Sequence, residues 1–204
     1  MVNRRIALAT VTFLAMSLPA SAQQASITKL MEPGPMPEKS FGPADAQVTV
    51  VEYASVTCHH CMNFHTETWP KLKEKYVDTG KIRFIMREFP LDALATAGFM
   101  LARCAGDDRW YPVLDLLYRS QESWAHAKNP ADELLNTVRQ AGMTKDGFEA
   151  CLGDQKLLEG INKTRTRGTE LGVNSTPTFF VNGQKHAGAL TIEQFDKILE
   201  PLLK

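Results

Sequence analysis

The stretch Gln47–Cys61, QVTVVEYASVTCHHC, decides the fold of this chain. Its first eight residues, which end at Ala54, are mostly β-branched or apolar and have the length of a buried strand. Helical spacing of apolar residues begins at the second cysteine. Cys58 and Cys61 are therefore predicted to lie between the end of a strand and the first turn of a helix.

The residues after this stretch predict a second strand behind the helix. The helical pattern runs to Val77, and Pro70 inside it is expected to kink the helix. Gly80 is expected to end the helix. Lys81–Phe89, KIRFIMREF, alternates apolar and polar residues over part of its length, as a strand does. The predicted unit is strand–helix–strand.

The rest of the chain predicts a helical region followed by a hairpin. Only helical patterns occur between residues 91 and 172. Thr178–Val181 is again an apolar run of strand type, and Asn182-Gly183 after it is a strong signal for a two-residue hairpin turn. Gln184–Ala187 is expected to be the return strand, and Ile192–Leu203 a final amphipathic helix.

The first 22 residues have the features of a secretory signal peptide. Arg4 and Arg5 precede an apolar run of about 13 residues, and Ala20-Ser21-Ala22 supplies the small residues of a cleavage site. A membrane-spanning helix needs about 20 apolar residues, so cleavage near Ala22 is favoured over an uncleaved anchor. We therefore expect an exported, periplasmic protein.

The composition argues against two classes of partner. The chain has 23 basic and 23 acidic residues, and two of the basic residues leave with the signal peptide. A near-neutral chain without a basic run gives no reason to expect nucleic acid or an anionic membrane surface as a partner. The four cysteines form an even set, which in an oxidising compartment suggests two pairs.

The spacing of Cys58 and Cys61 suits reversible disulfide chemistry. Residues i and i+3 of a helix share a face, so the two sulfurs can bond and separate with little backbone movement. A cysteine at a helix N-terminus is stabilised as the thiolate, which is the reactive form. Cys58 is thus the expected nucleophile and Cys61 its resolving partner. His60, and to a smaller extent His59, would favour the thiolate further.

Two other interpretations of the cysteine pair compete with this one. A Cys-x-x-Cys motif can be half of a zinc site, and His59, His60 and His65 lie close by in the sequence. Adjacent ligands on one helical turn cannot all reach one metal, and no second ligand pair occurs elsewhere, so we predict no metal site. The pair could also be an inert structural disulfide, but its place between a buried strand and a helix argues against that.

Three segments together resemble the DsbA-type thiol–disulfide oxidoreductases of the thioredoxin superfamily. They are Val50–Cys61, Arg87–Asp92 and Ser175–Gly183. The resemblance implies an α/β thioredoxin fold, with a central mixed sheet flanked by helices and an inserted α-helical domain. The implied organisation is a signal peptide at 1–22, an irregular lead-in at 23–46, a thioredoxin domain at 47–91 and 173–204, and an α-helical insertion at 92–172.

The resemblance also implies roles for residues outside the cysteine pair. Pro177 matches the cis-proline that faces the Cys-x-x-Cys loop, and Thr176 would offer backbone groups to an extended substrate segment. Glu52 matches a buried acid beneath the active site that could relay protons to and from the second cysteine. Some relatives carry a second, non-catalytic disulfide in the insertion, and this is the role expected for Cys104 and Cys151.

The expected function is the introduction of disulfide bonds into reduced, unfolded exported proteins. No cofactor is expected, because the dithiol itself carries the electrons. The resemblance implies a DsbB-like membrane protein as the reoxidising partner. A monomer is expected, because the short segment before the fold leaves no room for the dimerisation domain of isomerase relatives.

The dipeptide between the cysteines keeps other functions open. His59 stands where the commonest family motif has proline, and Thr176 before the proline is also seen in isomerase and reductase relatives. A disulfide reductase or isomerase that uses the same two cysteines is therefore an alternative. A metal-binding carrier is a further alternative with less support.

Overall fold

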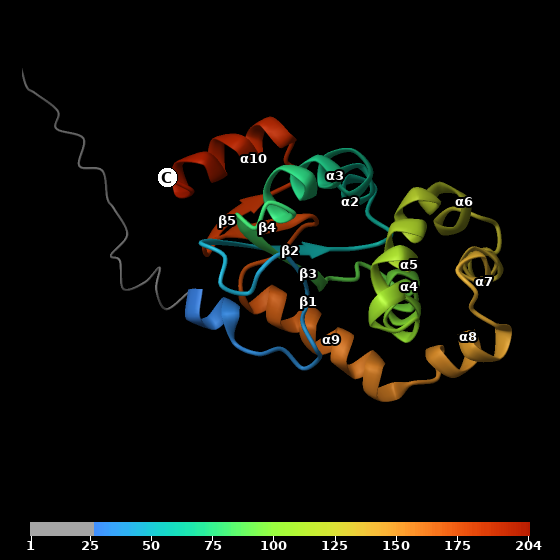
Figure 1. Ribbon diagram of the computed structural model, residues 1–204. Coiled ribbons are helices and arrows are strands. Elements are labelled where there is room, and N and C mark those ends of the chain that lie inside the picture. Colours follow the sequence, from blue (N-terminus) through green and yellow to red (C-terminus); the bar gives the residue numbers. More distant parts are fainter. Residues whose placement is uncertain (1–26) are drawn as a thin grey trace, which may run out of the picture.

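The computed structural model describes residues 27–204, and the predicted signal peptide lies outside the described residues. The strands are β1 (Lys39–Phe41), β2 (Val48–Ala54), β3 (Ile82–Glu88), β4 (Thr178–Val181) and β5 (Gln184–Ala187). They form one sheet in the order β1-β3-β2-β4-β5, with helices on both faces (Figure 1). β2 and β3 are parallel, and the other neighbours are antiparallel. The predicted fold class is therefore confirmed.

A helical rod follows β2, and further helices lie between β3 and β4. The rod consists of α2 (His59–Asn63), a π-helical turn η1 (Phe64–Thr68), α3 (Trp69–Leu72) and a second π-helical turn η2 (Lys73–Val77). The inserted helices are α4 (Ala93–Cys104), α5 (Asp107–Arg119), α6 (Gln121–Ala125), α7 (Pro130–Gln140), α8 (Lys145–Leu152) and α9 (Gln155–Glu170). The chain continues after β5 with α10 (Ile192–Leu199) and a 3-10 turn η3 (Glu200–Leu202).

The central strand β2 is buried on both faces. Its side chains alternate, so Val50 packs with the rod and α10 while Tyr53 packs on the opposite face. On that face α9 packs directly against the sheet. The approach is so close that a Cβ atom at Gly168 would lie 2.9 Å from the rings of Tyr53 and Phe89. The helix α9 thus continues the insertion in sequence but covers the sheet in space (Figure 1).

The kink expected at Pro70 takes the form of a π-helical turn. Proline has no N–H, and its ring conflicts with the carbonyl four residues earlier, which belongs to Thr66 in η1. The rod continues through this position, and its widened turn buries both Phe64 and His65. Such turns are frequent at functional sites.

The lead-in is more regular than the sequence predicted. Residues 27–31 form a helical turn, and Lys39–Phe41 forms the edge strand β1. Arg87 explains the difference, since its guanidinium donates to the Glu38 carboxylate at 2.9 and 3.0 Å and to the Leu30 carbonyl at 2.8 Å. These contacts join residues far apart in the chain, and no local pattern reports them.

The hairpin after β4 follows its sequence signal. Asn182 and Gly183 have φ values of 45° and 86°, as a type I′ turn requires at both central positions. The turn pairs β4 with β5 while β4 also pairs with β2. This arrangement brings the start of β4, just after Pro177, next to the end of β2.

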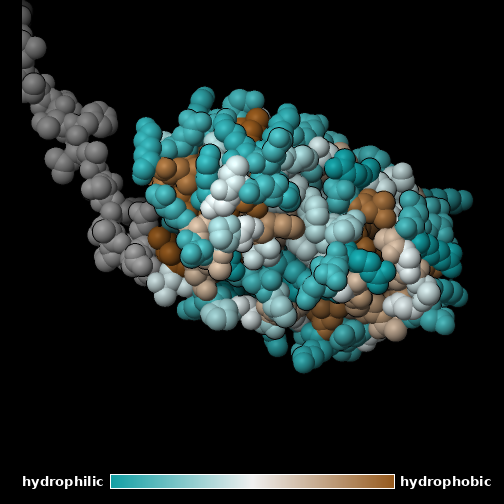
Figure 2. All heavy atoms as spheres, viewed as in Figure 1, coloured by the Kyte–Doolittle hydropathy of each residue, from teal (hydrophilic) through white to brown (hydrophobic). Residues whose placement is uncertain are grey.

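Hydrophobic residues form small separate patches on the mostly hydrophilic face seen in Figure 2. Within residues 27–204, the large hydrophobic side chains that are exposed are Leu91 and Leu202. A search of the same residues finds no helix with the length and apolar character that crossing a bilayer requires. Most of the large hydrophobic side chains of the described residues are therefore buried.

Candidate active site

Cys58 is the N-cap residue of α2. Its backbone is extended, with φ −84° and ψ 118°, and its carbonyl accepts the N–H of Met62 at 3.0 Å. The free N–H groups of the first helical turn therefore point toward the Cys58 sulfur. Cys58 is 8% exposed, whereas Cys61 is fully buried, and both are free thiols in this structure. A substrate can thus reach only the first of the two sulfurs.

The surroundings of Cys58 favour its thiolate. A hydrogen bond from the Cys61 thiol lowers the pKa of Cys58 most, and hydrogen bonds from Thr176 and from the backbone N–H groups of Cys61 and His60 lower it further. Burial acts in the opposite direction, and the net result is a pKa of about 5 instead of the usual 9.0. Cys58 is therefore mainly a thiolate at neutral pH, which is the nucleophilic form of cysteine.

Cys61 has the opposite character. Burial is the main cause that raises the pKa of its thiol, and the negative charges of Cys58 and Glu52 raise it further. Cys61 therefore prefers to be a neutral thiol that donates to the Cys58 thiolate. This asymmetry separates the exposed attacking sulfur from the buried resolving sulfur.

The peptide bond between Thr176 and Pro177 is cis and lies against the cysteine loop. The Cys58 sulfur is 3.3 Å from the Thr176 carbonyl oxygen, to which a protonated thiol can donate. The Thr176 hydroxyl has no other hydrogen-bond partner within residues 27–204, so it is available to donate to the thiolate form of Cys58. Thr176 can therefore accommodate both protonation states of the nucleophile.

The two histidines of the motif are exposed. His59 Nδ1 lies 3.4 Å from a carboxylate oxygen of Glu122 in α6, and both side chains are solvent-accessible. A pair of this kind contributes little to stability. The contribution that the structure shows from His60 to the low pKa of Cys58 comes from its backbone N–H.

Glu52 lies on β2 and is completely buried. One oxygen of its carboxylate is 3.1 Å from Nε2 of His65, without the alignment of a direct hydrogen bond. The His65 ring also stacks on Tyr118 of α5, with ring centroids 4.1 Å apart. In the sequence His65 stood out only as a possible metal ligand, although its position four residues after Cys61 places it one turn along the same rod.

Gln121 is a second residue that the sequence did not reveal. It lies in α6 and is fully buried. Its side-chain amide donates to the carbonyl of Val56 at 2.7 Å and to the carbonyl of Cys58 at 3.2 Å. The helical insertion is thereby fastened to the backbone of the cysteine loop. A lone glutamine in a helical pattern carries no signal of such a contact.

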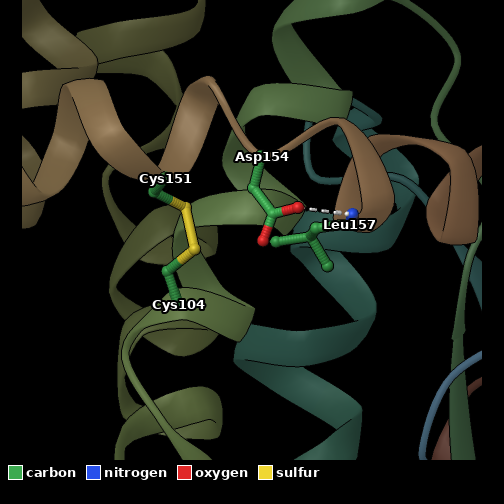
Figure 3. Close-up of a disulfide and its surroundings, with 4 residues drawn as sticks. All are labelled: Cys104, Cys151, Asp154 and Leu157. Atoms are coloured by element: carbon green, nitrogen blue, oxygen red, sulfur yellow. Dashed lines mark hydrogen bonds between the residues drawn. A yellow bond between two sulfur atoms is a disulfide. The ribbon is translucent and has the colours of Figure 1, made fainter.

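Cys104 and Cys151 form a disulfide that joins the end of α4 to α8 (Figure 3). Asp154 follows in the next loop and caps α9 by accepting the backbone N–H of Leu157 at 3.0 Å. The bond thus joins two helices of the insertion and lies close to the start of α9.

A metal site is not formed by the candidate residues. Within residues 27–204, no three side chains of histidine, cysteine, aspartate or glutamate converge as a metal ion would need. His59 and His60 are exposed, whereas His65 is buried, so the three side chains do not converge on one site.

Titration of Cys58 is expected to show a thiolate with a midpoint near the pKa of about 5. The ultraviolet absorbance of the thiolate, followed across pH with the Cys104–Cys151 bond intact, measures this midpoint. The variant Cys61→Ala should titrate at higher pH, because it removes the hydrogen bond that lowers the pKa most. A midpoint near 9.0 in the unaltered protein would contradict the geometry described above.

The same shift makes the stability of the reduced protein depend on pH. The Cys58 thiol has the usual pKa of 9.0 when unfolded and about 5 when folded, so its stabilising contribution is complete above pH 9 and is lost as the pH falls through 5. Cys61 adds nothing well below pH 9.0, because its thiol is protonated in both states there; near and above that pH its raised pKa opposes any further gain in stability. The free energy of unfolding of the reduced protein should therefore rise with pH relative to that of the oxidised protein.

Comparisons with known proteins agree with this architecture. The sequence profile of the thioredoxin family matches residues 36–201. A curated protein of Rickettsia bellii, named as a protein-disulfide oxidoreductase, is 37% identical over 146 residues, which are 70% of this chain and 56% of that protein. This chain therefore spans little more than half the length of that relative.

Solved structures give a more complete match. The crystal structure of α-DsbA1 from Wolbachia pipientis is similar with a TM-score of 0.78 and 30% sequence identity, over 86% of this chain and 94% of that one. DsbA of Chlamydia trachomatis is similar with a TM-score of 0.68 over 84% of this chain and 95% of that one. At 17% identity the second match supports the fold alone.

Proposed function

This chain belongs to the DsbA-like family of thioredoxin-fold protein-disulfide oxidoreductases, and from this premise we propose that it introduces disulfide bonds into reduced, unfolded exported proteins. The observation that carries the proposal is the asymmetry of the cysteine pair. The pKa of Cys58 is lowered to about 5 while that of Cys61 is raised. A stabilised thiolate favours the reduced form of the pair, and the disulfide form is then a strong oxidant.

The exchange begins at the oxidised Cys58–Cys61 pair. A substrate thiolate attacks the accessible Cys58 sulfur, the bond to Cys61 breaks, and Cys61 leaves with the electron pair and takes up a proton. A second substrate thiolate then attacks the substrate sulfur of the mixed disulfide. Cys58 leaves as its stabilised thiolate, so the substrate is oxidised by two electrons and the pair is reduced.

Thr176 and Pro177 are proposed to position the substrate. An extended peptide can add to the backbone of the Thr176 segment as a further strand, with main-chain hydrogen bonds that do not depend on sequence. Such recognition suits an enzyme that accepts many unfolded chains. The contact of 3.3 Å between the Cys58 sulfur and the Thr176 carbonyl oxygen supports this placement.

The proposed setting is the periplasm, where disulfides persist. The signal peptide predicted at 1–22 supports export. A DsbB-like membrane protein is the proposed reoxidising partner, since each substrate leaves the pair reduced. The dithiol carries the electrons without a cofactor, and the monomer is the proposed working form.

A reductase or isomerase is the second candidate, favoured by Thr176 before the cis-proline. The reduction potential of the Cys58–Cys61 pair separates the two candidates. The mature protein would be equilibrated in glutathione buffers, quenched with an alkylating agent and analysed by peptide mass, so that Cys104 and Cys151 are scored separately.

The oxidase is expected to have a potential well above the value of about −270 mV that is typical of thioredoxin. This expectation follows from the stabilised Cys58 thiolate. Any interaction that stabilises the reduced form of the Cys58–Cys61 pair raises the reduction potential of the pair. A potential near or below that of thioredoxin would reject the oxidase and favour a reductase.

A further inference from the structure

The turn that carries Cys58 is held in place by the helical insertion. Residues 55–58 form a tight turn between β2 and α2, closed by a hydrogen bond of 3.2 Å from the Cys58 N–H to the Ser55 carbonyl. Gln121 of α6 reaches this turn from the insertion, and its amide Nε2 donates at 2.7 Å to the Val56 carbonyl and at 3.2 Å to the Cys58 carbonyl. One side chain thereby fixes both the middle and the end of the turn.

The orientation of the Gln121 amide is set by its two acceptors. Two carbonyl oxygens face the same side-chain atom, so only the NH₂ group can lie there. The other end of the amide, Oε1, is buried and has no hydrogen-bond partner within residues 27–204. The donor capacity of this fully buried side chain is therefore directed at the turn.

The helix α4 supports the same turn from another side. Val56 is fully buried, and a Cβ atom at Gly98 of α4 would lie 2.8 Å from its side chain. Asp92, the N-cap residue of α4, accepts the Thr57 hydroxyl at 2.8 Å. The insertion thus contacts Val56, Thr57 and Cys58 in turn, so the position of the nucleophile depends on it.

The direction of the Cys58 carbonyl decides how the first turn of α2 meets the Cys58 sulfur. This carbonyl accepts the Met62 N–H at 3.0 Å as well as the Gln121 amide, which uses both of its lone pairs. Cys58 is thereby fixed as the N-cap residue, with the backbone N–H groups of His60 and Cys61 directed at its sulfur. A charged sulfur gains more from these donors than a neutral sulfur does.

The two redox forms depend on this alignment to different extents. In the oxidised form the covalent bond between the sulfurs holds Cys58 beside Cys61. In the reduced form that bond is absent and the Cys58 thiolate carries a full charge, so only non-covalent contacts keep the sulfur on the N–H groups. A contact that holds the turn therefore stabilises the reduced form more than the oxidised form, and it raises the reduction potential of the pair.

We propose that Gln121 is a positioning residue of the redox centre, which raises the reduction potential of the Cys58–Cys61 pair by holding the turn before α2 in the geometry that the reduced form needs. Gln121 contacts neither sulfur and acts through the backbone of Val56 and Cys58. This role rests on the proposed disulfide exchange, and it gives the helical insertion a part in setting the oxidising strength of the pair.

The variant Gln121→Met tests this role, because methionine is similar in length but has no side-chain N–H group. The full chain would be equilibrated in glutathione buffers, and the two forms of the Cys58–Cys61 pair counted by alkylation and peptide mass. We expect the equilibrium constant for reduction of the pair by glutathione to fall about tenfold, which lowers the potential of this two-electron couple by about 30 mV. The Cys58 thiolate, followed by its ultraviolet absorbance, should titrate at higher pH than in the unaltered protein.

Trp124→Phe is the matched control in the same helix. The buried Trp124 indole donates to the Leu117 carbonyl at 2.8 Å, so this variant also loses a buried hydrogen bond of α6, but one that lies within the insertion. It should keep the potential and the thiolate midpoint of the unaltered protein even where its stability falls. An equal fall of the potential in Trp124→Phe and Gln121→Met would overturn the proposal, and so would a Gln121→Met protein with an unaltered potential.

A second variant protects the test against a folding failure. Gln121→Asn keeps the amide but is shorter by one methylene group, so it should not reach both carbonyls, and the potential should fall to a smaller extent. If Gln121→Met does not fold, an unaltered potential of Gln121→Asn overturns the proposal.

The role of Gln121 and the proposed oxidase can fail separately. The potential of the unaltered protein decides the oxidase, and the difference between it and the variants decides the role of Gln121. A thioredoxin-like potential that falls further in Gln121→Met would reject the oxidase alone. A high potential that Gln121→Met retains would reject the role of Gln121 alone.

Discussion

Replacing Cys58 with alanine is expected to abolish disulfide exchange, with a loss of more than about a thousandfold in rate. Cys58 is the only one of the two active-site sulfurs that solvent reaches, since Cys61 is fully buried. It is also the sulfur whose pKa is lowered, to about 5, so that it is a thiolate at neutral pH. Buried Cys61 cannot take over either property. The rate at which the oxidised protein forms a disulfide in a reduced two-cysteine peptide measures the effect.

Cys61→Ala is the matched variant, and its expected behaviour is different. It retains the nucleophile but lacks the thiol that resolves the mixed disulfide. When it reacts with an oxidised peptide, a covalent adduct through Cys58 should therefore accumulate and persist, and intact mass detects it. A Cys58→Ala protein that keeps a tenth of the exchange rate, or that forms this adduct through Cys61, would contradict the assigned roles.

The features that the sequence predicted correctly depend on neighbouring residues. A buried-type strand that runs into a helix is visible around Cys58, and the hairpin at Asn182-Gly183 follows from the φ values that such residues tolerate. In each case a few consecutive residues are enough to explain why the local structure forms.

The features that the sequence missed depend on residues far apart in the chain. The edge strand β1 is held by the ion pair of Arg87 with Glu38, which lie 49 residues apart. Gln121 reaches the cysteine loop across 65 residues to Val56. His65 meets Glu52 only because the rod widens before Pro70 and packs on β2. No local periodicity contains these contacts, so sequence reasoning could name Glu52 but not its partner.

The helical insertion shows the same limit in its boundary. Its helices were expected to form one inserted unit, and α9 does follow the others without a strand between them. Yet Gly168 allows α9 to approach the rings of Tyr53 and Phe89 on the sheet. A helix that ends the insertion in sequence thus completes the core of the sheet domain. Only the packing of Gly168 reveals this double role.

The double variant Cys104→Ala/Cys151→Ala is expected to lose about 4 kcal/mol of unfolding free energy, because the cross-link restricts the unfolded chain. The bonded residues are separated by 47 positions, and the entropy lost by the unfolded state grows with the length of the closed loop. Guanidinium denaturation, with the Cys58–Cys61 pair oxidised in all samples, measures the loss.

The single variant Cys104→Ala separates the cross-link from side-chain packing. It breaks the same bond at its exposed end but leaves the buried Cys151 sulfur in place between the helices. If the cross-link is the source of the stability, the single and double variants should lose nearly the same free energy. A loss below about 1 kcal/mol in both variants would show that the cross-link contributes little to stability, contrary to the loop-entropy argument. A large loss in the double variant alone would instead assign the stability to the packing of Cys151 against its neighbours.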